Sequence, residues 1–311
     1  MFLSIIVPCY NEQHNLPTLF EKTVSALAAY ADNTEWIFVD DGSVDNTAAV
    51  LRDLCAKQPY PIKVLRFSRN FGKEAALLAG LEASDGEYVA LIDADLQQNP
   101  KYIAQMLEIL QNEPQYDSVA AYQDNRRESK LQIWCKKIFY ALINKITDVE
   151  FFHAASDFRV LRRCMVDAIV ALPEKCRFSK GIFSWVGFST KYIPYKVEPR
   201  FSGKTKWNFW KLTAYAMNGI VAFSDKPLII SSLLGILLFT IAIILMLITV
   251  IQTLIFGNDV AGYPTLASLI LLLSGIQLLT IGIIGQYLSK IYAEAKNRPV
   301  YILKETLDNQ K

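Results

Sequence analysis

The hydrophobic pattern divides the chain into an alternating first part and a strongly apolar last part. Through about residue 121, short apolar runs rich in β-branched residues alternate with segments in which apolar residues recur at helical spacing. Strands that alternate with helices in this way predict βαβ units and a parallel sheet. The predicted strands are 3–7, 36–39, 62–67, 88–92 and 118–121, and the predicted helices are 16–30, 46–56, 75–83 and 100–111.

The last part of the chain contains two long uncharged runs. No charged residue occurs from Pro227 to Asn258 or between Asp259 and Lys290. Each run exceeds the roughly 20 apolar residues that a helix needs to cross a bilayer, so two transmembrane helices in a hairpin are predicted. Their connection lacks Lys and Arg, whereas basic residues flank both outer ends. The positive-inside rule therefore predicts a multi-pass inner-membrane protein with the soluble domain and both termini in the cytoplasm.

Two further segments are candidates for the membrane surface. Residues 131–145 combine an apolar helical face with flanking lysines, which fits either membrane-surface binding or an ordinary core-facing helix. Residues 207–223 begin with aromatic side chains just after Lys204 and Lys206, a pattern that favours the headgroup region. The predicted organisation is a soluble domain (1–200), an interfacial helix (201–226), two transmembrane helices (227–289) and a cytoplasmic tail (290–311).

Polar residues follow four successive predicted strands, so they should gather at one edge of the sheet. Asp93 and Asp95 end the fourth strand, and residues two apart in an extended segment face the same way. Their hard oxygens suit Mg²⁺ or Mn²⁺, which would neutralise a diphosphate, and Gln97 lies further along the same side. The alternative is a polar turn in which Asp95 or Asn99 caps the helix after Pro100. The same edge should receive Tyr10, Glu12, Asp40, Asp41, Arg69 and Lys73.

The composition of the chain argues against several classes of binding site. The five cysteines have no CxxC spacing, which predicts neither a zinc site nor a disulfide framework and fits a reducing cytosol. The net charge of +2 gives no basis for nucleic-acid binding, and none is expected. Neither GxGxxG nor GxxxxGK[ST] occurs, so a metal rather than a backbone nest is expected to hold phosphates.

A diphosphate site, a membrane anchor and basic residues near the bilayer together indicate a soluble activated donor that meets an anionic lipid. Arginine and lysine hold phosphate through charge-assisted hydrogen bonds, although each such residue alone is more often a solvated surface charge. The candidates are Arg126, Arg127, Arg159, Arg177, Arg200, Lys204 and Lys206.

The ordered motifs resemble those of the GT-A-fold glycosyltransferases of family 2. Within that family the chain looks like the polyprenyl-phosphate glycosyltransferases, the group of bactoprenol glucosyltransferase and dolichol-phosphate-mannose synthase. The likeness covers essentially the whole chain, and the absence of a QxxRW motif argues against processive polysaccharide synthesis. The motifs that carry it are Pro8-Cys-Tyr-Asn-Glu12, Asp40-Asp-Gly-Ser-Val-Asp45, Arg69-Asn-Phe-Gly-Lys73, Asp93-Ala-Asp-Leu-Gln97, Ser156-Asp-Phe-Arg159, Arg177-Phe178 and Arg298-Pro-Val-Tyr301.

The resemblance implies an α/β domain of the GT-A type, with a Rossmann-like, mostly parallel sheet, and roles for individual residues. Donor binding is expected from Pro8, Tyr10, Glu12, Asp40, Asp41, Lys73 and Asp93, and metal binding from Asp93, Asp95 and Gln97. The expected catalytic residues are Asp157 and Asp95. The acceptor phosphate is expected at Arg126, Arg200 and Lys206, and the basic grouping adds Arg159 and Arg177. Which of Asp40 and Asp41 contacts the base stays open.

The implied reaction is an inverting, metal-dependent transfer of one hexose from a nucleotide sugar to polyprenyl phosphate, here undecaprenyl phosphate. UDP-glucose is the first choice of donor; UDP-N-acetylglucosamine, GDP-mannose and an aminoarabinose donor remain open. Because a phosphate monoester is largely a dianion above its second pKa of about 6, Asp157 is expected to orient groups more than to remove a proton. A homo-oligomer, a separate flippase and a downstream transferase are the expected partners. The alternatives are a lipid-sugar flippase and a non-catalytic, membrane-tethered nucleotide-binding protein.

Overall fold

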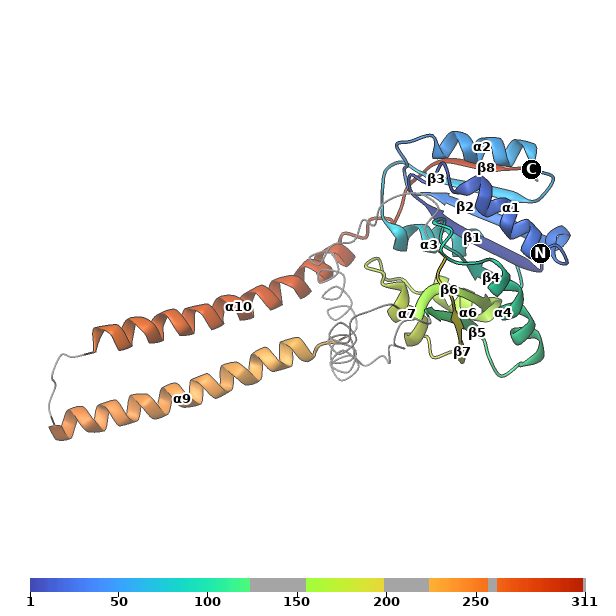
Figure 1. Ribbon diagram of the computed structural model, residues 1–311. Coiled ribbons are helices and arrows are strands. Elements are labelled where there is room, and N and C mark those ends of the chain that lie inside the picture. Colours follow the sequence, from blue (N-terminus) through green and yellow to red (C-terminus); the bar gives the residue numbers. More distant parts are fainter. Residues whose placement is uncertain (124–154, 199–223, 257–261, 310–311) are drawn as a thin grey trace.

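The computed structural model describes residues 1–123, 155–198, 224–256 and 262–309 (Figure 1). Within these residues one mixed sheet has the strand order β7-β5-β6-β4-β1-β2-β3-β8. The strands are β1 (Leu3–Cys9), β2 (Thr34–Asp40), β3 (Ile62–Phe67), β4 (Tyr88–Leu91), β5 (Ser118–Gln123), β6 (Ala155–Arg162), β7 (Thr190–Tyr195) and β8 (Leu303–Asp308). The helices are α1 (Leu16–Ala26), α2 (Thr47–Lys57), α3 (Lys73–Ala83), α4 (Lys101–Asn112), α6 (Arg163–Val170), α7 (Ser179–Trp185), α9 (Lys226–Phe256) and α10 (Tyr263–Ala295), with a 3₁₀ turn at Ala31–Asn33.

The predicted alternation of strands and helices is confirmed for the first five strands. β1 pairs in parallel with both β2 and β4, and β2 pairs in parallel with β3. The sheet departs from the prediction at β6, which runs antiparallel to β4 and β5, and at β8, which runs antiparallel to β3. β8 lies within the segment predicted as a tail, because its polar sequence carries no strand alternation strong enough to reveal it.

Helices cover both faces of the sheet because successive strand residues point to opposite sides. Trp36 and Phe38 of β2 pack in the cluster that includes α1, α2 and α4, whereas Ile37 and Val39 pack in the cluster that includes α3, α6 and α7. The central strands are buried on both faces, as expected for a three-layer α/β domain. The carboxyl ends of β1 to β4 are thereby held at one edge.

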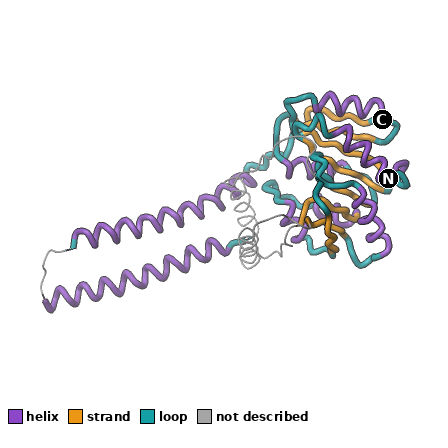
Figure 2. Tube along the Cα trace, viewed as in Figure 1, coloured by secondary structure: helices purple, strands orange, loops and turns teal. Residues whose placement is uncertain are grey.

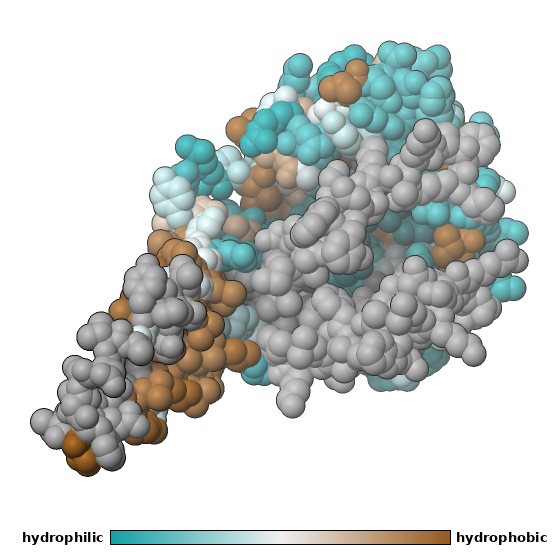
Figure 3. Space-filling view, turned by 60° about the vertical axis from the view of Figure 1, so that its left-hand side comes forward, coloured by the Kyte–Doolittle hydropathy of each residue, from teal (hydrophilic) through white to brown (hydrophobic). Residues whose placement is uncertain are grey.

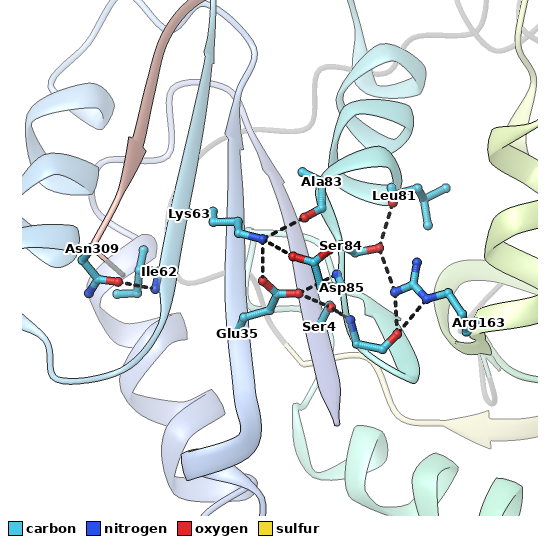
Figure 4. A network of polar contacts seen from close by, with 11 residues as sticks. Ser4, Glu35, Ile62, Lys63, Leu81, Ala83, Ser84, Asp85, Arg163 and Asn309 are labelled. Carbon is cyan, nitrogen blue, oxygen red and sulfur yellow. Dashed lines mark hydrogen bonds and ion pairs between the residues drawn. The ribbon is translucent and has the colours of Figure 1, made fainter. Parts of the chain in front are cut away.

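A buried polar network fastens the opposite edge of the sheet (Figure 4). The Ser4 hydroxyl donates to the Glu35 carboxylate at 2.6 Å and accepts from the backbone N–H of Gly86 at 2.8 Å. The Lys63 ammonium lies 3.0 Å from Glu35 and 2.6 Å from Asp85. Since these residues come from β1, β2, β3 and the loop before β4, the network links the four central strands where they begin.

Helices α9 and α10 contact each other and project away from the sheet (Figure 2). Among the coloured residues of Figure 3, those of the two helices are mainly hydrophobic, whereas most of those of the α/β domain are hydrophilic. Residues Lys226–Leu245 and Leu272–Ala295 are long and apolar enough to cross a bilayer. The predicted pair of long apolar helices is thus present. The amphipathic segments 131–145 and 207–223 lie outside the described residues.

The chain returns from α10 to the α/β domain. Tyr301 stacks on Phe67 with ring centroids 4.9 Å apart, and Ile302 accepts a hydrogen bond from the N–H of Ser68. Arg52 of α2 forms an ion pair with Glu305 of β8 at 2.7 Å. The C-terminal end of α10 is therefore tied to the sheet by β8.

We expect Lys63→Met to destabilise the protein by about 3 kcal/mol, because it leaves the carboxylate of Glu35 buried without a cation. The Glu35 side chain is only 1% exposed and Lys63 is 19% exposed. The matched control is Lys57→Met, whose partner Asp53 is 68% exposed, and which should cost less than about 1 kcal/mol. Thermal unfolding of the full-length protein in detergent measures both. Equal losses in the two variants would contradict the importance of the network.

Candidate active site

A cavity of about 410 Å³ opens at the carboxyl ends of β1 to β4. This is the edge at which open α/β sheets bind ligands, and the volume is in the range of small-molecule sites. Its lining residues are Pro8, Cys9, Tyr10, Glu12, Asp41, Asn70, Gly72, Lys73, Ala76, Asp93, Ala94 and Asp95. Most of the predicted donor residues therefore lie together.

The loops after β1 and β2 are joined by reciprocal hydrogen bonds. The backbone N–H of Asn11 donates to the Ser43 hydroxyl at 2.9 Å, and the side-chain amide oxygen of Asn11 accepts from the N–H of Val44 at 3.0 Å. The N–H of Glu12 donates to the Thr47 hydroxyl at 2.9 Å. Asn11 has a φ of 59°, a left-handed conformation that asparagine tolerates better than most residues. These bonds fix the backbone that presents Tyr10 and Glu12 to the cavity.

The two adjacent aspartates of the second loop differ in position. Asp40 is fully buried, accepts the N–H of Ser43 at 2.9 Å and lies 3.3 Å from the Arg66 guanidinium. Asp41 lines the cavity, and its carboxylate accepts the backbone N–H groups of residues 71–72 at 2.6 and 3.0 Å. Asp40, which was expected to bind the donor, does not line the cavity, and its carboxylate contacts the loop and Arg66. Of these two aspartates, Asp41 is the one that lines the cavity.

Gly42 allows the loops after β2 and β3 to approach each other. Its φ is +66°, and a Cβ atom there would lie 2.4 Å from the carbonyl carbon of Arg69. A side chain at this position would therefore both strain the backbone and displace the third loop. With the contacts of Asp41, this close approach fixes the backbone that leads into Lys73.

The two carboxylates after β4 share the cavity for a different reason than predicted. β4 ends at Leu91 and residues 94–95 form a turn, so Asp93 and Asp95 are not in an extended strand, yet both line the cavity. The Asp95 carboxylate accepts the N–H of Gln97 at 3.1 Å, which closes this turn. The prediction of a common site holds, while the argument from strand pleating was wrong.

Gln98, which has no predicted role, orients Asp93. Its buried side-chain amide accepts the N–H of Asp93 at 2.8 Å and donates to the Asp93 carboxylate at 3.0 Å. Gln97 and Gln98 are chemically identical neighbours, so composition and spacing could not separate their roles. The turn geometry decides that Gln98 is the residue bonded to Asp93.

Lys73 lies between the carboxylate of Asp93, in the loop after β4, and that of Asp157, on the neighbouring strand β6. Its ammonium is 2.6 Å from Asp93 and 2.8 Å from Asp157, the latter on β6 beside β4. Burial by itself would raise the pKa of Asp157, but Lys73 first, then Lys180 and Arg159, hold that pKa well below its usual range. Burial lowers the pKa of Lys73, but the two carboxylates raise it by more. The pKa of Lys73 is therefore well above its ordinary value. Asp157 is therefore an anion throughout the neutral range and a poor general base.

The residues present fit a divalent cation of the magnesium class. The described residues contain no group of three or more His, Cys, Asp or Glu side chains suited to a metal. Mg²⁺ is commonly bound through one or two carboxylates together with substrate phosphates and water, and Asp93 and Asp95 supply two such carboxylates. In this structure the oxygens of Asp93 contact Lys73 and Gln98. Both line the donor cavity, where a diphosphate would complete the ligand set.

Arg159, expected to bind the acceptor phosphate, is buried beneath the site. Its guanidinium lies 3.7 Å from the ring centroid of Phe183 and donates to the backbone carbonyl of Ser156 at 3.1 Å. Burial lowers its pKa to about 10, partly offset by Asp157. Arg159 thus acts electrostatically on Asp157 and does not line the donor cavity.

The side chain of Arg177 is hydrogen-bonded at the C-terminal end of α6. Its guanidinium donates to the carbonyl oxygens of Ile169 and Leu172 at 2.8 and 3.2 Å, which satisfies the C-terminal end of α6. The other expected acceptor residues, Arg126, Arg200 and Lys206, lie outside the described residues.

Comparison with known proteins identifies the family. The family model for glycosyl transferase family 2 matches residues 4–170, which include the donor cavity and the Lys73–Asp157 pair. The chain belongs to glycosyltransferase family 2. The family resemblance expected from the motifs is confirmed.

Relatives match along nearly the whole chain. An uncharacterized glycosyltransferase of Synechocystis is 40% identical over 97% of this chain and 95% of its own. The SfII prophage-derived bactoprenol glucosyl transferase of Shigella flexneri is 39% identical over 98% of each chain. A prophage bactoprenol glucosyl transferase homolog of Escherichia coli is 39% identical over 98% of this chain and 99% of its own. The likeness therefore includes the long apolar helices as well as the α/β domain.

We expect Gln98→Leu to weaken Mn²⁺ binding in the presence of UDP by roughly 10- to 100-fold, because residues that orient a metal ligand contribute on that scale. Gln115→Leu, an exposed change of the same type, is the control. Electron paramagnetic resonance of free and bound Mn²⁺ gives the affinities. If Gln98→Leu bound Mn²⁺ as tightly as the control, its contact with Asp93 would have no such role.

Proposed function

We propose that the protein transfers one glucosyl residue from UDP-glucose to undecaprenyl phosphate at the cytoplasmic face of the membrane, with inversion at the anomeric carbon. The observation that carries the proposal is the Asp93–Lys73–Asp157 arrangement at the donor cavity. It combines an anionic site for a metal–diphosphate with a fixed cation at the same edge of the sheet. The relatives named as bactoprenol glucosyl transferases support glucose and a polyprenyl carrier as the substrates.

The cavity divides naturally into two parts for a nucleotide sugar. Pro8, Tyr10, Glu12 and Asp41, from the loops after β1 and β2, would contact the base and ribose. Asp93 and Asp95 would hold the diphosphate through Mg²⁺ or Mn²⁺. When bound, such an ion neutralises the charge that develops on the leaving diphosphate.

The transfer itself requires no protein base. A phosphate oxygen of the acceptor attacks the anomeric carbon from the face opposite the diphosphate, and the bond to the diphosphate oxygen breaks, which inverts the configuration. Above its second pKa of about 6 the acceptor is mostly a dianion and has no proton to lose from that oxygen. Asp157, held ionised by Lys73, would instead keep that ammonium in position beside the reacting phosphates.

The two apolar helices support a membrane anchor. Helices α9 and α10 would cross the bilayer as a hairpin, with the α/β domain on the cytoplasmic side. Tyr287 of α10 donates a hydrogen bond to the Ser224 carbonyl just before α9, so the two helices are joined at the end next to the domain. A lipid-linked acceptor would thus be presented close to the donor cavity.

The full-length protein in detergent should release UDP only when UDP-glucose, undecaprenyl phosphate and Mg²⁺ or Mn²⁺ are all present. Asp95→Ala should reduce this release by about 100-fold or more, because charge stabilisation of a transition state is worth that much. Asp53→Ala, a change of an exposed aspartate on α2, is the control. UDP-N-acetylglucosamine, GDP-mannose and an aminoarabinose donor are tested in parallel. Equal release without lipid, or from Asp95→Ala, would contradict the proposal.

The loss of activity at acidic pH should reflect protonation of the acceptor phosphate and not of Asp157. We expect kcat/KM for undecaprenyl phosphate to fall below about pH 6, where the phosphate becomes a monoanion. Since the pKa of Asp157 is depressed, this carboxylate would lose its charge, and with it its stabilising pair with Lys73, only in much more acidic solution. Initial rates from pH 5 to 8 measure the limb. Activity that stays constant down to pH 5 would contradict the role given to the dianion.

A further inference from the structure

A second cavity, of about 610 Å³, adjoins the donor cavity. The two cavities share Gly72 and Lys73 as lining residues. The opposite wall of the second cavity is formed by the C-terminal turns of α10, including Tyr292, and by residues 296–300. The cavity therefore lies at the C-terminal end of α10. Figure 1 shows this end of the helix next to the α/β domain.

The charge of this second cavity is strongly positive. Five basic residues line it against one acidic residue, Glu74. Glu74 already accepts hydrogen bonds from the N–H and the hydroxyl of Ser179. The basic residues are Lys73, Lys175, Arg177, Lys296 and Arg298.

Three of these cations are available for a ligand. Lys73 is paired with Asp93 and Asp157, and Arg177 caps α6, as described above. Lys175, Lys296 and Arg298 form no ion pair with any carboxylate of the described residues. The ammonium of Lys296 lies 4.1 Å from the ring centroid of Tyr292, which keeps it at the wall of the cavity. A basic cavity with three such cations is suited to an anion with several oxygens.

Hydrogen bonds hold the walls of the cavity in place without a bound ligand. The carboxylate of Glu294, near the end of α10, accepts the backbone N–H groups of Lys175 at 2.9 Å and Cys176 at 2.8 Å. This contact fastens the loop between α6 and α7 to the long apolar helix. On the other side Glu74 holds the start of α7. The cations are therefore presented by segments tied both to the helix and to the domain.

We propose that this cavity binds the phosphate group of the polyprenyl phosphate acceptor, through Lys175, Lys296 and Arg298. The assignment rests on the proposed function. It is favoured by the position of the cavity at the end of a helix that is apolar enough to cross a bilayer, where a lipid headgroup would lie. Since Lys73 lines both cavities, a phosphate bound here is next to the donor site. None of these three residues is among those expected from the sequence to contact the acceptor.

The test is binding, measured without a donor sugar. Purified full-length protein in detergent is titrated with undecaprenyl phosphate, undecaprenol and inorganic phosphate, and complexes are quantified by native mass spectrometry. Lys296→Gln/Arg298→Gln should weaken undecaprenyl phosphate binding about tenfold or more, since hydrogen bonds to charged groups contribute on that scale, and should leave undecaprenol unchanged. Lys57→Gln/Lys304→Gln, which removes two exposed lysines outside the cavity, is the control and should bind like wild type.

Lys175→Gln, on a different segment, gives an independent reduction should the double variant fail to fold. UDP binding and thermal unfolding report the integrity of each variant. Undecaprenyl phosphate bound equally by wild type and the cavity variants, or not bound by wild type, overturns the proposal. Inorganic phosphate bound as tightly as the lipid would make this a free-phosphate site and would also overturn it. A lack of transfer from every donor sugar would contradict the proposed function while leaving this binding result intact.

Discussion

The ion-pair arrangement of Lys73 between Asp93 and Asp157 is the interaction on which the rest of the site depends. The carboxylate of Asp93, just after β4, and that of Asp157, on the adjacent strand β6, face the same edge, and without a cation between them they would repel each other. Lys73 can stand there because the loop before it is held by Asp41 and by the close approach at Gly42. The three loops after β1, β2 and β3 therefore act as one support.

The position of Lys73 at the start of α3 also connects two cavities. Its side chain belongs to the donor edge, while the next residue, Glu74, fastens α7. Glu294 fastens the loop that precedes α7 to the end of α10. Polar contacts joined by short stretches of backbone thus link α10 to the carboxylates of the donor site. This arrangement suits chemistry in which one substrate is soluble and the other is delivered by the membrane.

Much of the fold can be predicted from the local pattern of apolar and polar residues, whereas the strands β6 and β8 cannot. β1 to β5 were predictable because apolar β-branched runs bounded by polar turns are a local signal. β8 is polar and pairs with a strand more than two hundred residues earlier, so only tertiary structure reveals it. β6 follows a long segment in which the sequence indicates only the amphipathic stretch 131–145, so no strand was predicted there. The direction of β6 nevertheless matters, since its pairing with β4 brings Asp157 beside Asp93.

The sequence predicted which edge of the sheet carries the site, but it did not predict which side chain makes each contact there. Spacing placed Asp93 and Asp95 together, but it could not tell a pleated strand from the turn that joins them. Adjacent identical or similar residues were the hardest cases: Gln97 against Gln98, and Asp40 against Asp41. In each pair one side chain faces inward to a structural partner, and that choice depends on turn geometry and burial.

Electrostatics at Asp157 defines what this edge can do chemically. Because Lys73 lowers the pKa of Asp157, this carboxylate is a weak proton acceptor near neutral pH. The site is suited to an acceptor that arrives already ionised. For such an acceptor the remaining barrier lies in bringing two anions together, which oriented cations lower. The basic residues around Lys73 therefore fit a phosphate nucleophile better than a sugar hydroxyl.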